Sequence, residues 1–367
     1  ITKNLENNYK VFQKNPDIAL EKIFAPEHGF FGEASAGAKV NYKNKNFKEV
    51  EIVSLYGRNR KPTKTMLKGL DLIIYDIQDI GSRFYTYIST LGMVIEAAAE
   101  HNIEIMILDR PNPISGKIIE GAILDTSFKS FVGYYPIPIR YGLTVGELTY
   151  MAINENWLSP LPKKITIVKM DGWKRSMFFD ETDLPWIPPS PNIPNLETAI
   201  IYPGMCLFEA TNLSEGRGTQ KPFLQIGAPW IKKDLINQLK ALKLEGININ
   251  FTKFSPKTIP GKALNPKFEN DTCYGSIFKV TEKHKFKALE TALRKISIIN
   301  EKYDDKFNFN SISLNKLYGN NSLTNYLNTS SQSRKINKQD AFGDFLKNER
   351  KALKSFSKKS SKYYLYD

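Results

Sequence analysis

The sequence predicts an α/β protein in which a domain with a doubly wound, mostly parallel sheet precedes a second α/β domain. In the first half, apolar runs rich in Ile and Leu recur, and helical patterns of about 10 to 15 residues separate them. The stretch DLPWIPPSPNIPN then breaks the pattern, because its prolines exclude regular helix and inner strand. The 367 residues suffice for two or three domains.

Each predicted element of the first half is an apolar run or an amphipathic pattern bounded by turn residues. The apolar runs predict strands within residues 18–26, 51–57, 70–80, 103–113 and 164–170. Amphipathic patterns predict helices within residues 63–70, 86–102 and 144–157, the last opened by a capping-box pair, Thr144 and Glu147.

Beyond the proline-rich stretch, the same reasoning predicts a second α/β unit. Helices are expected within residues 229–242 and 285–303, and strands near 247–254 and 273–282. We place the domain boundary so that the domains span residues 1–160 and 161–367.

The chain is basic, with a formal net charge of +14 and its basic excess heaviest near the C-terminal end. Such a surface suits nucleic acid, an anionic membrane or an acidic wall polymer. The sequence has no RRM, zinc-finger or helix-turn-helix signature, so we favour a solvated basic surface and expect no nucleic-acid partner. No stretch approaches the roughly 18 apolar residues of a membrane span.

Motifs for metals and cofactors are missing from the sequence. It has two cysteines, far apart, and three histidines, which argues against a metal centre. It contains neither GxGxxG nor GxxxxGK[ST], so we expect no nicotinamide or nucleotide cofactor. The EASAG segment around Ser35 lacks the first glycine of a nucleophile elbow, which makes serine-hydrolase chemistry a minor alternative.

Polar clusters follow three of the predicted strands. They are Glu27-His28, Asp76-x-Gln78-Asp79 and Asp109-Arg110-x-Asn112. In a parallel sheet the carboxyl ends of the strands border the crevice where ligands bind. Asp and Asn are also common loop and cap residues, but three clusters at one predicted edge favour a functional site.

Two further segments carry residues suited to a polar ligand. EATNLSEGRGT brings Glu209, Asn212 and Arg217 together in a glycine-rich turn, which either binds a ligand or is only a tight turn with a structural arginine. In DIGSRFYTYIST, Arg83 and Tyr85 lie where a strand passes into a helix. The arginine fork and the tyrosine face suit carboxylates and sugar rings.

The motifs PEHGFFGE, DLIIYDIQDIGSRFYTYIST, ILDRPNPISG, SFVGYYPIPIRYGLTVGEL, PWIPPSPNIP and YPGMCLFEATNLSEGRGTQKPF, in this order, resemble the DUF1343 family. Its characterised members are NamZ-type exo-β-N-acetylmuramidases, which are glycoside hydrolases. The resemblance runs from about residue 20 to the final YYLYD, and the family's usual first strand is expected to precede residue 1.

The resemblance implies a Rossmann-like N-terminal domain and a smaller C-terminal α/β domain, with the active site in the cleft between them. It also implies release of terminal N-acetylmuramic acid from the non-reducing end of peptidoglycan fragments. A muropeptide or disaccharide is then the expected partner, and export to the periplasm or the exterior is the expected location. The resemblance also implies that the glutamate of the EHG motif, here Glu27, is catalytic.

Glycoside hydrolysis usually needs a carboxylic acid and a second group that serves as base or nucleophile. Glu27 suits the acid, and His28, Asp76, Asp79 and Glu209 are candidates for the second group. The substrate's N-acetyl group is an alternative nucleophile. The lactyl carboxylate of muramic acid needs a cation, for which Arg83, Arg110 and Arg217 are candidates.

Two other functions remain as alternatives. One is a non-catalytic wall-binding protein that keeps the cleft without turnover. The other is a hydrolase of an amide or ester bond, in which Ser35 or His28 would matter more than Glu27. The sequence gives no indication of the oligomeric state.

Overall fold

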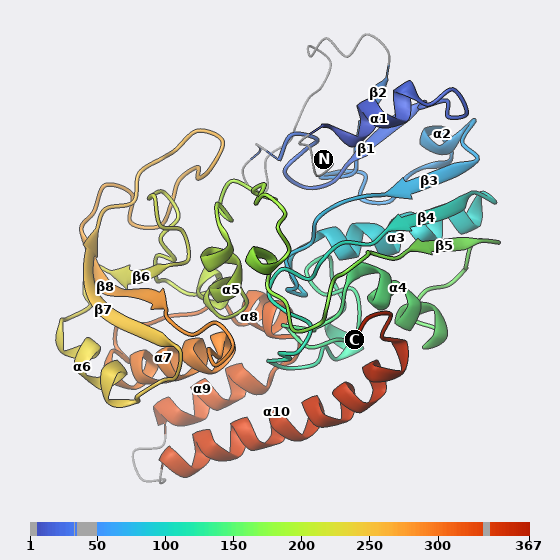
Figure 1. Ribbon diagram of the computed structural model, residues 1–367. Coiled ribbons are helices and arrows are strands. Elements are labelled where there is room, and N and C mark those ends of the chain that lie inside the picture. The colour runs from blue at the N-terminus through green and yellow to red at the C-terminus, as the bar shows by residue number, and fades with distance from the viewer. Residues whose placement is uncertain (1–5, 33, 35–49, 333–337) are drawn as a thin grey trace.

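The computed structural model describes residues 6–32, 34, 50–332 and 338–367. Figure 1 shows two α/β parts side by side, with strands β1 to β5 in one part and β6 to β8 in the other. The predicted mixed α/β architecture with parallel strands is confirmed. In the described chain, no helix is both long enough and apolar enough to cross a membrane.

The first part is built from parallel strands. β1 (Lys22–Ala25) pairs with β2 (Glu51–Ser54), and β3 (Leu72–Tyr75), β4 (Glu104–Leu108) and β5 (Ile165–Val168) form a second sheet in that order. The helices of this part are α1 (Asn8–Lys14), α2 (Lys64–Leu67), α3 (Tyr87–Glu100) and α4 (Val145–Asn154), with 3-10 turns η1 (Thr126–Phe128) and η2 (Phe179–Glu181).

One hydrophobic core holds the second parallel sheet against α3 and α4. Its buried side chains include Ile105 and Ile107 of β4 and Leu91 and Ile95 of α3. The capping box at the start of α4 is confirmed: the Glu147 backbone N–H donates to the Thr144 hydroxyl, and the Glu147 carboxylate accepts from the Thr144 N–H. The core therefore holds the ends of β3 and β4 in place against the two helices.

The second part has an antiparallel sheet in the order β6-β8-β7. Its elements are α5 (Leu196–Met205), η3 (Cys206–Ala210), β6 (Gln225–Ala228), α6 (Asp234–Ala241), β7 (Ile247–Phe254), β8 (Cys273–Val280), α7 (Ala288–Lys302), α8 (Ser311–Tyr318), α9 (Ser322–Gln332), α10 (Lys338–Ser360) and η4 (Ser361–Tyr363). Helices α8 to α10 lie outside the elements that the sequence predicts.

The C-terminal end returns to the first part. Phe356 of α10 is buried in the core of the first part, and the Tyr366 hydroxyl donates to Asp109 at 2.7 Å. Strand β5 lies in the second parallel sheet although it begins at Ile165, beyond the residue at which we place the domain boundary. The boundary between residues 160 and 161 itself stays a prediction.

The segment that joins β3 to α3 is held by a buried arginine. Arg83 is completely buried, and its Nη1 donates to the carbonyls of Ala122 and Ile137 at 2.6 and 2.7 Å. Its Nη2 donates to the carbonyls of Leu317 and Tyr318 in α8 at 2.9 and 2.7 Å. Arg83 thus joins the two parts, and its role as a candidate for binding the lactyl carboxylate stays a prediction.

The same segment contains a buried carboxyl group. Asp79 Oδ2 accepts from the Gly81 N–H at 2.7 Å and from the Tyr141 hydroxyl, whereas Oδ1 has no hydrogen-bond partner among the described residues. Burial raises the pKa of Asp79 to about 6, although the two hydrogen bonds oppose this change. Asp79 is therefore a buried side chain that holds the turn at Gly81.

Replacing Arg83 is expected to destabilise the fold strongly. Arg83→Ala removes four hydrogen bonds from buried carbonyls. It should lower the free energy of unfolding in urea by about 3 kcal/mol or more. Arg294→Ala is the matched control, because Arg294 pairs with Glu290 on the surface of α7 and should cost under about 1 kcal/mol. Equal losses in the two variants would contradict the joining role of Arg83.

The raised pKa of Asp79 predicts a pH-dependent stability. Between pH 3.8 and about 6 the folded state holds a proton that the unfolded state releases, so this contribution to stability is lost as pH rises. Asp79→Asn should therefore gain stability relative to wild type from pH 4 to pH 7. At about 1.4 kcal/mol per pH unit the gain is up to about 3 kcal/mol. Thermal unfolding at several pH values measures it.

Asp305→Asn, at an exposed position, is the control for this series and should follow the wild-type pH profile. Parallel pH profiles for Asp79→Asn and wild type would show that the Asp79 carboxyl titrates alike in the folded and unfolded chain.

Candidate active site

A tight turn after β1 presents Glu27 and His28. His28 and Gly29 both have positive φ angles, 71° and 77°, and the Gly29 N–H donates to the Pro26 carbonyl at 3.0 Å. A left-handed conformation suits glycine and is costly for most other residues, so His28 stores some strain in this turn. The turn fixes the direction in which both side chains leave the sheet.

Glu27 lies against the start of α3. Its side chain is buried, and Oε2 accepts a hydrogen bond of 2.8 Å from the hydroxyl of Thr86, the residue before the first turn of α3. The positive end of a helix dipole favours a negative charge at this position. The structure thus supplies a carboxylate that is oriented by one hydroxyl and by the field of a 14-residue helix.

His28 is held as a neutral ring beside Glu27. Its Nδ1 lies 2.8 Å from the Ala34 carbonyl oxygen, which can only accept, so Nδ1 carries the proton and Nε2 keeps its lone pair. Burial lowers the pKa of His28, and the nearby charge of Arg217 lowers it further, while the Ala34 hydrogen bond and Glu27 oppose this. His28 is therefore a hydrogen-bonding group without charge at neutral pH.

The second part contributes a group of charged side chains to the same place. Arg217 Nη2 donates to Glu209 Oε1 at 2.5 Å, and Lys267 Nζ lies 3.2 Å from Glu215 Oε2. Burial raises the pKa of Glu209, although Arg217 opposes this. Burial opposes the charge of Arg217, but Glu209 and Glu215 outweigh it and raise the pKa of the guanidinium.

Aromatic rings connect the two groups. Tyr85 stacks on His28 with 6.2 Å between ring centroids and meets Tyr202 of α5 edge-on at 6.2 Å. Tyr202 meets Phe223 at 4.8 Å, and the Arg217 guanidinium lies 5.3 Å from the centre of the Phe223 ring. A cluster of buried rings thus connects the Glu27 turn to the Glu209–Arg217 loop, although Glu27 and Glu209 are 182 residues apart in sequence.

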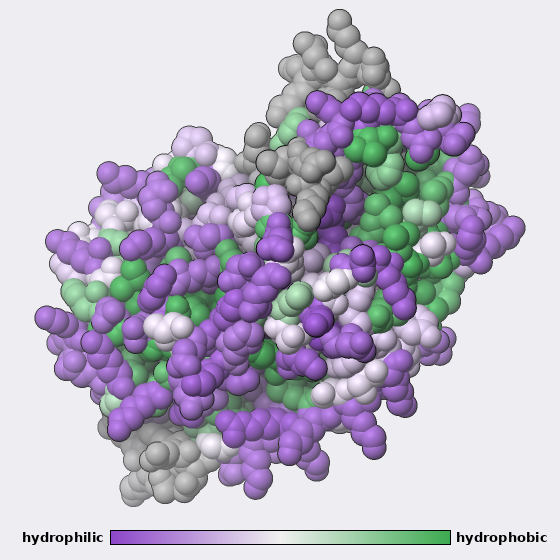
Figure 2. All heavy atoms as spheres, viewed as in Figure 1, coloured by the Kyte–Doolittle hydropathy of each residue, from purple (hydrophilic) through white to green (hydrophobic). Residues whose placement is uncertain are grey.

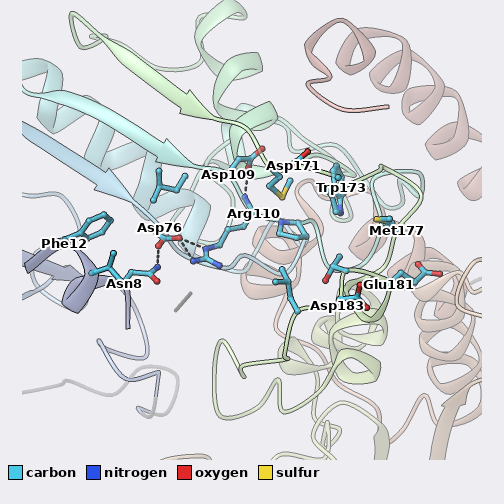
Figure 3. A pocket seen from close by; sticks show the side chains of 17 residues that line it. Asn8, Phe12, Asp76, Asp109, Arg110, Asp171, Trp173, Met177, Glu181 and Asp183 are labelled. Carbon is cyan, nitrogen blue, oxygen red and sulfur yellow. Dashed lines mark hydrogen bonds and ion pairs between the residues drawn. The ribbon is translucent and has the colours of Figure 1, made fainter. Parts of the chain in front are cut away.

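A separate cavity of about 650 Å³ lies where β3, β4 and β5 end (Figure 3). On its wall Arg110 Nε donates to Asp76 Oδ1 at 2.5 Å, and Asn8 of α1 donates to the other carboxylate oxygen. Helix α1 also packs Tyr9 against Phe30 of the Glu27 turn, with 5.5 Å between centroids. The structure therefore brings Asp76 and Arg110 together, in a cavity that α1 separates from the turn.

Three amides among the predicted site residues bind backbone groups within the chain, and their part in substrate binding stays a prediction. Gln78 donates to the carbonyls of Asp79 and Pro111, and Asn112 donates to the Leu143 carbonyl at 2.9 Å. Asn212 donates to the Lys306 carbonyl at 2.7 Å and accepts from the Asn308 N–H at 3.0 Å. These amides follow strands or lie in turns, where they donate hydrogen bonds to the carbonyls of neighbouring loops. Ser35 lies outside the described residues.

Sequence reasoning missed several residues of the site. Thr86 and Tyr202 belong to motifs that the sequence does single out, but nothing in those motifs distinguishes a hydroxyl or ring that faces Glu27 from one that faces the core. Lys267 donates to the carbonyls of Phe208, Glu209 and Leu213 and so supports the loop that carries Arg217. It lies in a segment without any motif, so only the fold reveals it.

The described residues contain no cluster of three or more His, Cys, Asp and Glu side chains that could hold a metal. The site instead offers a carboxylate, a neutral imidazole, a carboxyl group with a raised pKa, an arginine and a set of rings. Paired carboxyl groups in different environments are the usual equipment for acid–base chemistry at a glycosidic bond.

Similarity to known proteins extends along the whole chain. Residues 1–197 match the family model described as exo-beta-N-acetylmuramidase NamZ, N-terminal, and residues 200–366 match its C-terminal counterpart. The peptidoglycan beta-N-acetylmuramidase NamZ of Bacillus subtilis (strain 168) is 41% identical over 368 residues, which cover 100% of this chain and 84% of that protein.

Two solved structures are also similar to this chain. A DUF1343 family protein from Bacteroides fragilis NCTC 9343 superposes with a TM-score of 0.88 at 31% identity and covers 100% of this chain and 91% of that one. A second DUF1343 protein from the same organism gives a TM-score of 0.71 at 30% identity, with 99% and 90% covered. With matches in both halves, the chain belongs to the exo-β-N-acetylmuramidase NamZ family, as its resemblance to DUF1343 sequences predicts.

Proposed function

We propose that this chain, a glycoside hydrolase of the NamZ family, releases terminal N-acetylmuramic acid from the non-reducing end of peptidoglycan fragments, with Glu27 as its catalytic carboxylate. The name of the Bacillus subtilis relative supports the muramidase activity, and the description of the matching family supports the exo mode. The proposal includes export to the periplasm or the exterior, where a peptidoglycan substrate is met.

The observation that carries the proposal is the environment of Glu27. Its carboxylate is buried, oriented by the Thr86 hydroxyl at 2.8 Å and set beside the His28 ring at the border of the two parts. A carboxylate held in this way can stabilise the positive charge that develops on the sugar ring in the transition state, or exchange a proton with the glycosidic oxygen.

The contacts of the other carboxyl groups narrow the choice of the second catalytic group. Asp76 is engaged by Arg110 and Asn8, and Asp79 by Gly81 and Tyr141. His28 stacks on Tyr85 at one end of the aromatic cluster, and Glu209 is paired with Arg217 at the other end, so these two are our candidates for the second group. Nucleophilic attack by the N-acetyl group of the substrate remains the alternative that needs neither.

Arg217 is our choice for binding the lactyl carboxylate. Its Nη2 donates to Glu209, and its buried Nε lies 3.9 Å from Glu215 Oε1, too far for a hydrogen bond, and makes none among the described residues. A buried donor without a partner is costly unless a ligand completes it. The Nε of Arg83 lacks a partner among the described residues too, but Arg83 is completely buried, and Arg110 is paired with Asp76 in the separate cavity, so both are less suited to this task.

A non-catalytic wall-binding protein would use the same site without turnover, and a hydrolase of amide or ester bonds would depend on His28 or Ser35. The first alternative predicts saturable binding of muramic acid without product. The second predicts that Glu27 is dispensable.

Glu27→Gln is expected to lower kcat on a chromogenic β-N-acetylmuramide by about a thousandfold, because the amide cannot exchange a proton or carry the charge. The amide oxygen still accepts from Thr86, so the unfolding curve should stay close to that of wild type. Glu104→Gln is the control: Glu104 is the first residue of β4 and lies at the opposite end of that strand from the site. Wild-type turnover by Glu27→Gln would refute the assignment.

Arg217→Lys is expected to weaken recognition of the lactyl carboxylate by about tenfold, since lysine keeps the charge and loses the planar fork. The measurement is the ratio of inhibition constants for N-acetylmuramic acid and its methyl ester, which lacks the charge. In wild type the free acid should bind more tightly, and in Arg217→Lys the two should converge. Arg110→Lys serves as the comparison. If the two inhibition constants converged in Arg110→Lys and kept their wild-type ratio in Arg217→Lys, the role would belong to Arg110.

A further inference from the structure

A second cavity, of about 490 Å³, lies where the end of α10 meets the loop before Glu120. None of its lining residues belongs to the group around Glu27. It is lined by Gly116, Lys117, Ile119, Arg175, Lys354, Ser357, Lys358, Ser361 and Tyr364.

The lining of this cavity is positively charged. Lys117, Lys354 and Lys358 are exposed, and no Asp or Glu lies among the lining residues. Arg175 forms the floor: its guanidinium lies 3.4 Å from the centre of the Tyr364 ring and is neutralised by the buried Glu147 at 2.6 Å. The three lysines are therefore the charges that a ligand in the cavity would meet.

The positive charge continues along α10. Lys347, Lys351, Lys354 and Lys358 recur at intervals of four, three and four residues, which places them on one face of the helix. They span about 16 Å at 1.5 Å per residue. The part of the chain that the structure describes gives these four no ion pair, whereas their neighbours Arg350 and Lys359 are paired with Glu290 and Glu155. Figure 2 shows a mostly hydrophilic lower edge where α10 runs in Figure 1.

We propose that this cavity and the lysine row, Lys347–Lys351–Lys354–Lys358 together with Lys117, bind a linear phosphodiester polymer, one phosphate entering the cavity and the next ones following α10. Lysine ammonium groups are point-charge partners of phosphate, and the Ser357 hydroxyl on the cavity wall adds a neutral donor. A row of single charges on one helix face suits a chain with one charge per repeat unit.

A membrane surface fits these observations less well. Helices that bind in the interface expose apolar residues beside their lysines. On α10 the apolar side chains Leu346 and Phe356 are buried against the protein. The exposed face therefore offers charge without any side chain to insert between lipids.

Nucleic acid also fits less well. Sites for single-stranded nucleic acid combine positive charge with exposed aromatic rings on which bases stack. The aromatic residue of the cavity, Tyr364, is covered by the Arg175 guanidinium. A phosphate polymer without bases fits the positive charge of the cavity and needs no exposed ring for stacking.

The inference goes beyond muramidase activity and does not depend on Glu27. A wall polymer bound at α10 would hold the enzyme near the wall while the Glu27 site works on short fragments. Binding and catalysis can therefore be measured separately, and either can fail alone.

The test measures binding of the full chain to a fluorescently labelled poly(glycerol phosphate) of about 20 units by anisotropy. Lys117→Ala/Lys354→Ala/Lys358→Ala should weaken binding at least tenfold and reduce the slope of log K against log salt by about 2, since about 0.7 counterions are released per neutralised phosphate. Turnover of the chromogenic muramide should not change.

The matched control removes the same charge elsewhere. Lys232→Ala/Lys240→Ala/Lys243→Ala alters exposed lysines at and beside α6 and should bind within twofold of wild type. Equal weakening in both triple variants, or none in either, would overturn the site. The assignment to a phosphodiester polymer without bases would be overturned if phosphatidylglycerol vesicles or a 20-nucleotide DNA strand bound as tightly as the polymer and lost binding in the same variant.

Discussion

The Arg83 guanidinium is the interaction on which the arrangement of the two parts depends. It is buried without a carboxylate partner, and burial lowers its pKa to about 9. Its two terminal nitrogens donate to four carbonyls of the first part and of α8, while its Nε has no hydrogen-bond partner among the described residues. Tyr85, Thr86 and the start of α3 follow directly in the sequence, so the position of Thr86 against Glu27 is set by the same anchor. A shift of α8 would therefore be felt at the Glu27 carboxylate.

The candidate active site is shared between the parts for a related reason. The first part supplies a turn with a left-handed His28 and a helix start, and the second supplies the Glu209–Arg217 loop, which Lys267 supports through three carbonyls. The charge of Arg217 helps to lower the pKa of His28, so the two loops are electrostatically coupled before any substrate arrives. Neither part alone would hold these groups at their present separation.

Much of the fold follows from sequence periodicity, since β1 to β5, α3, α4, β7, β8 and α7 lie within the predicted segments. The residues of the candidate site are predicted less well from the sequence. Glu27 stood out because it follows a buried run and a proline, and the family resemblance singled it out. Gln78, Asn112 and Asn212 have the same polar character after strands and in turns but serve backbone groups, since loops need partners for their carbonyls. Lys267 had no local signal, because its partners are more than 50 residues away.

The buried arginines and the exposed lysines of α10 serve two different tasks. Arg83, Arg140 and Arg175 are buried and bind carbonyls or a carboxylate, which the rigid fork of guanidinium donors allows. The lysines of α10 remain exposed, on a helix whose apolar face is already used by the core. A charge with no internal partner is kept in water at little cost, and it is available for ligands. The net charge of +14 is therefore informative about partners only where exposed lysines align, and on α10 they do.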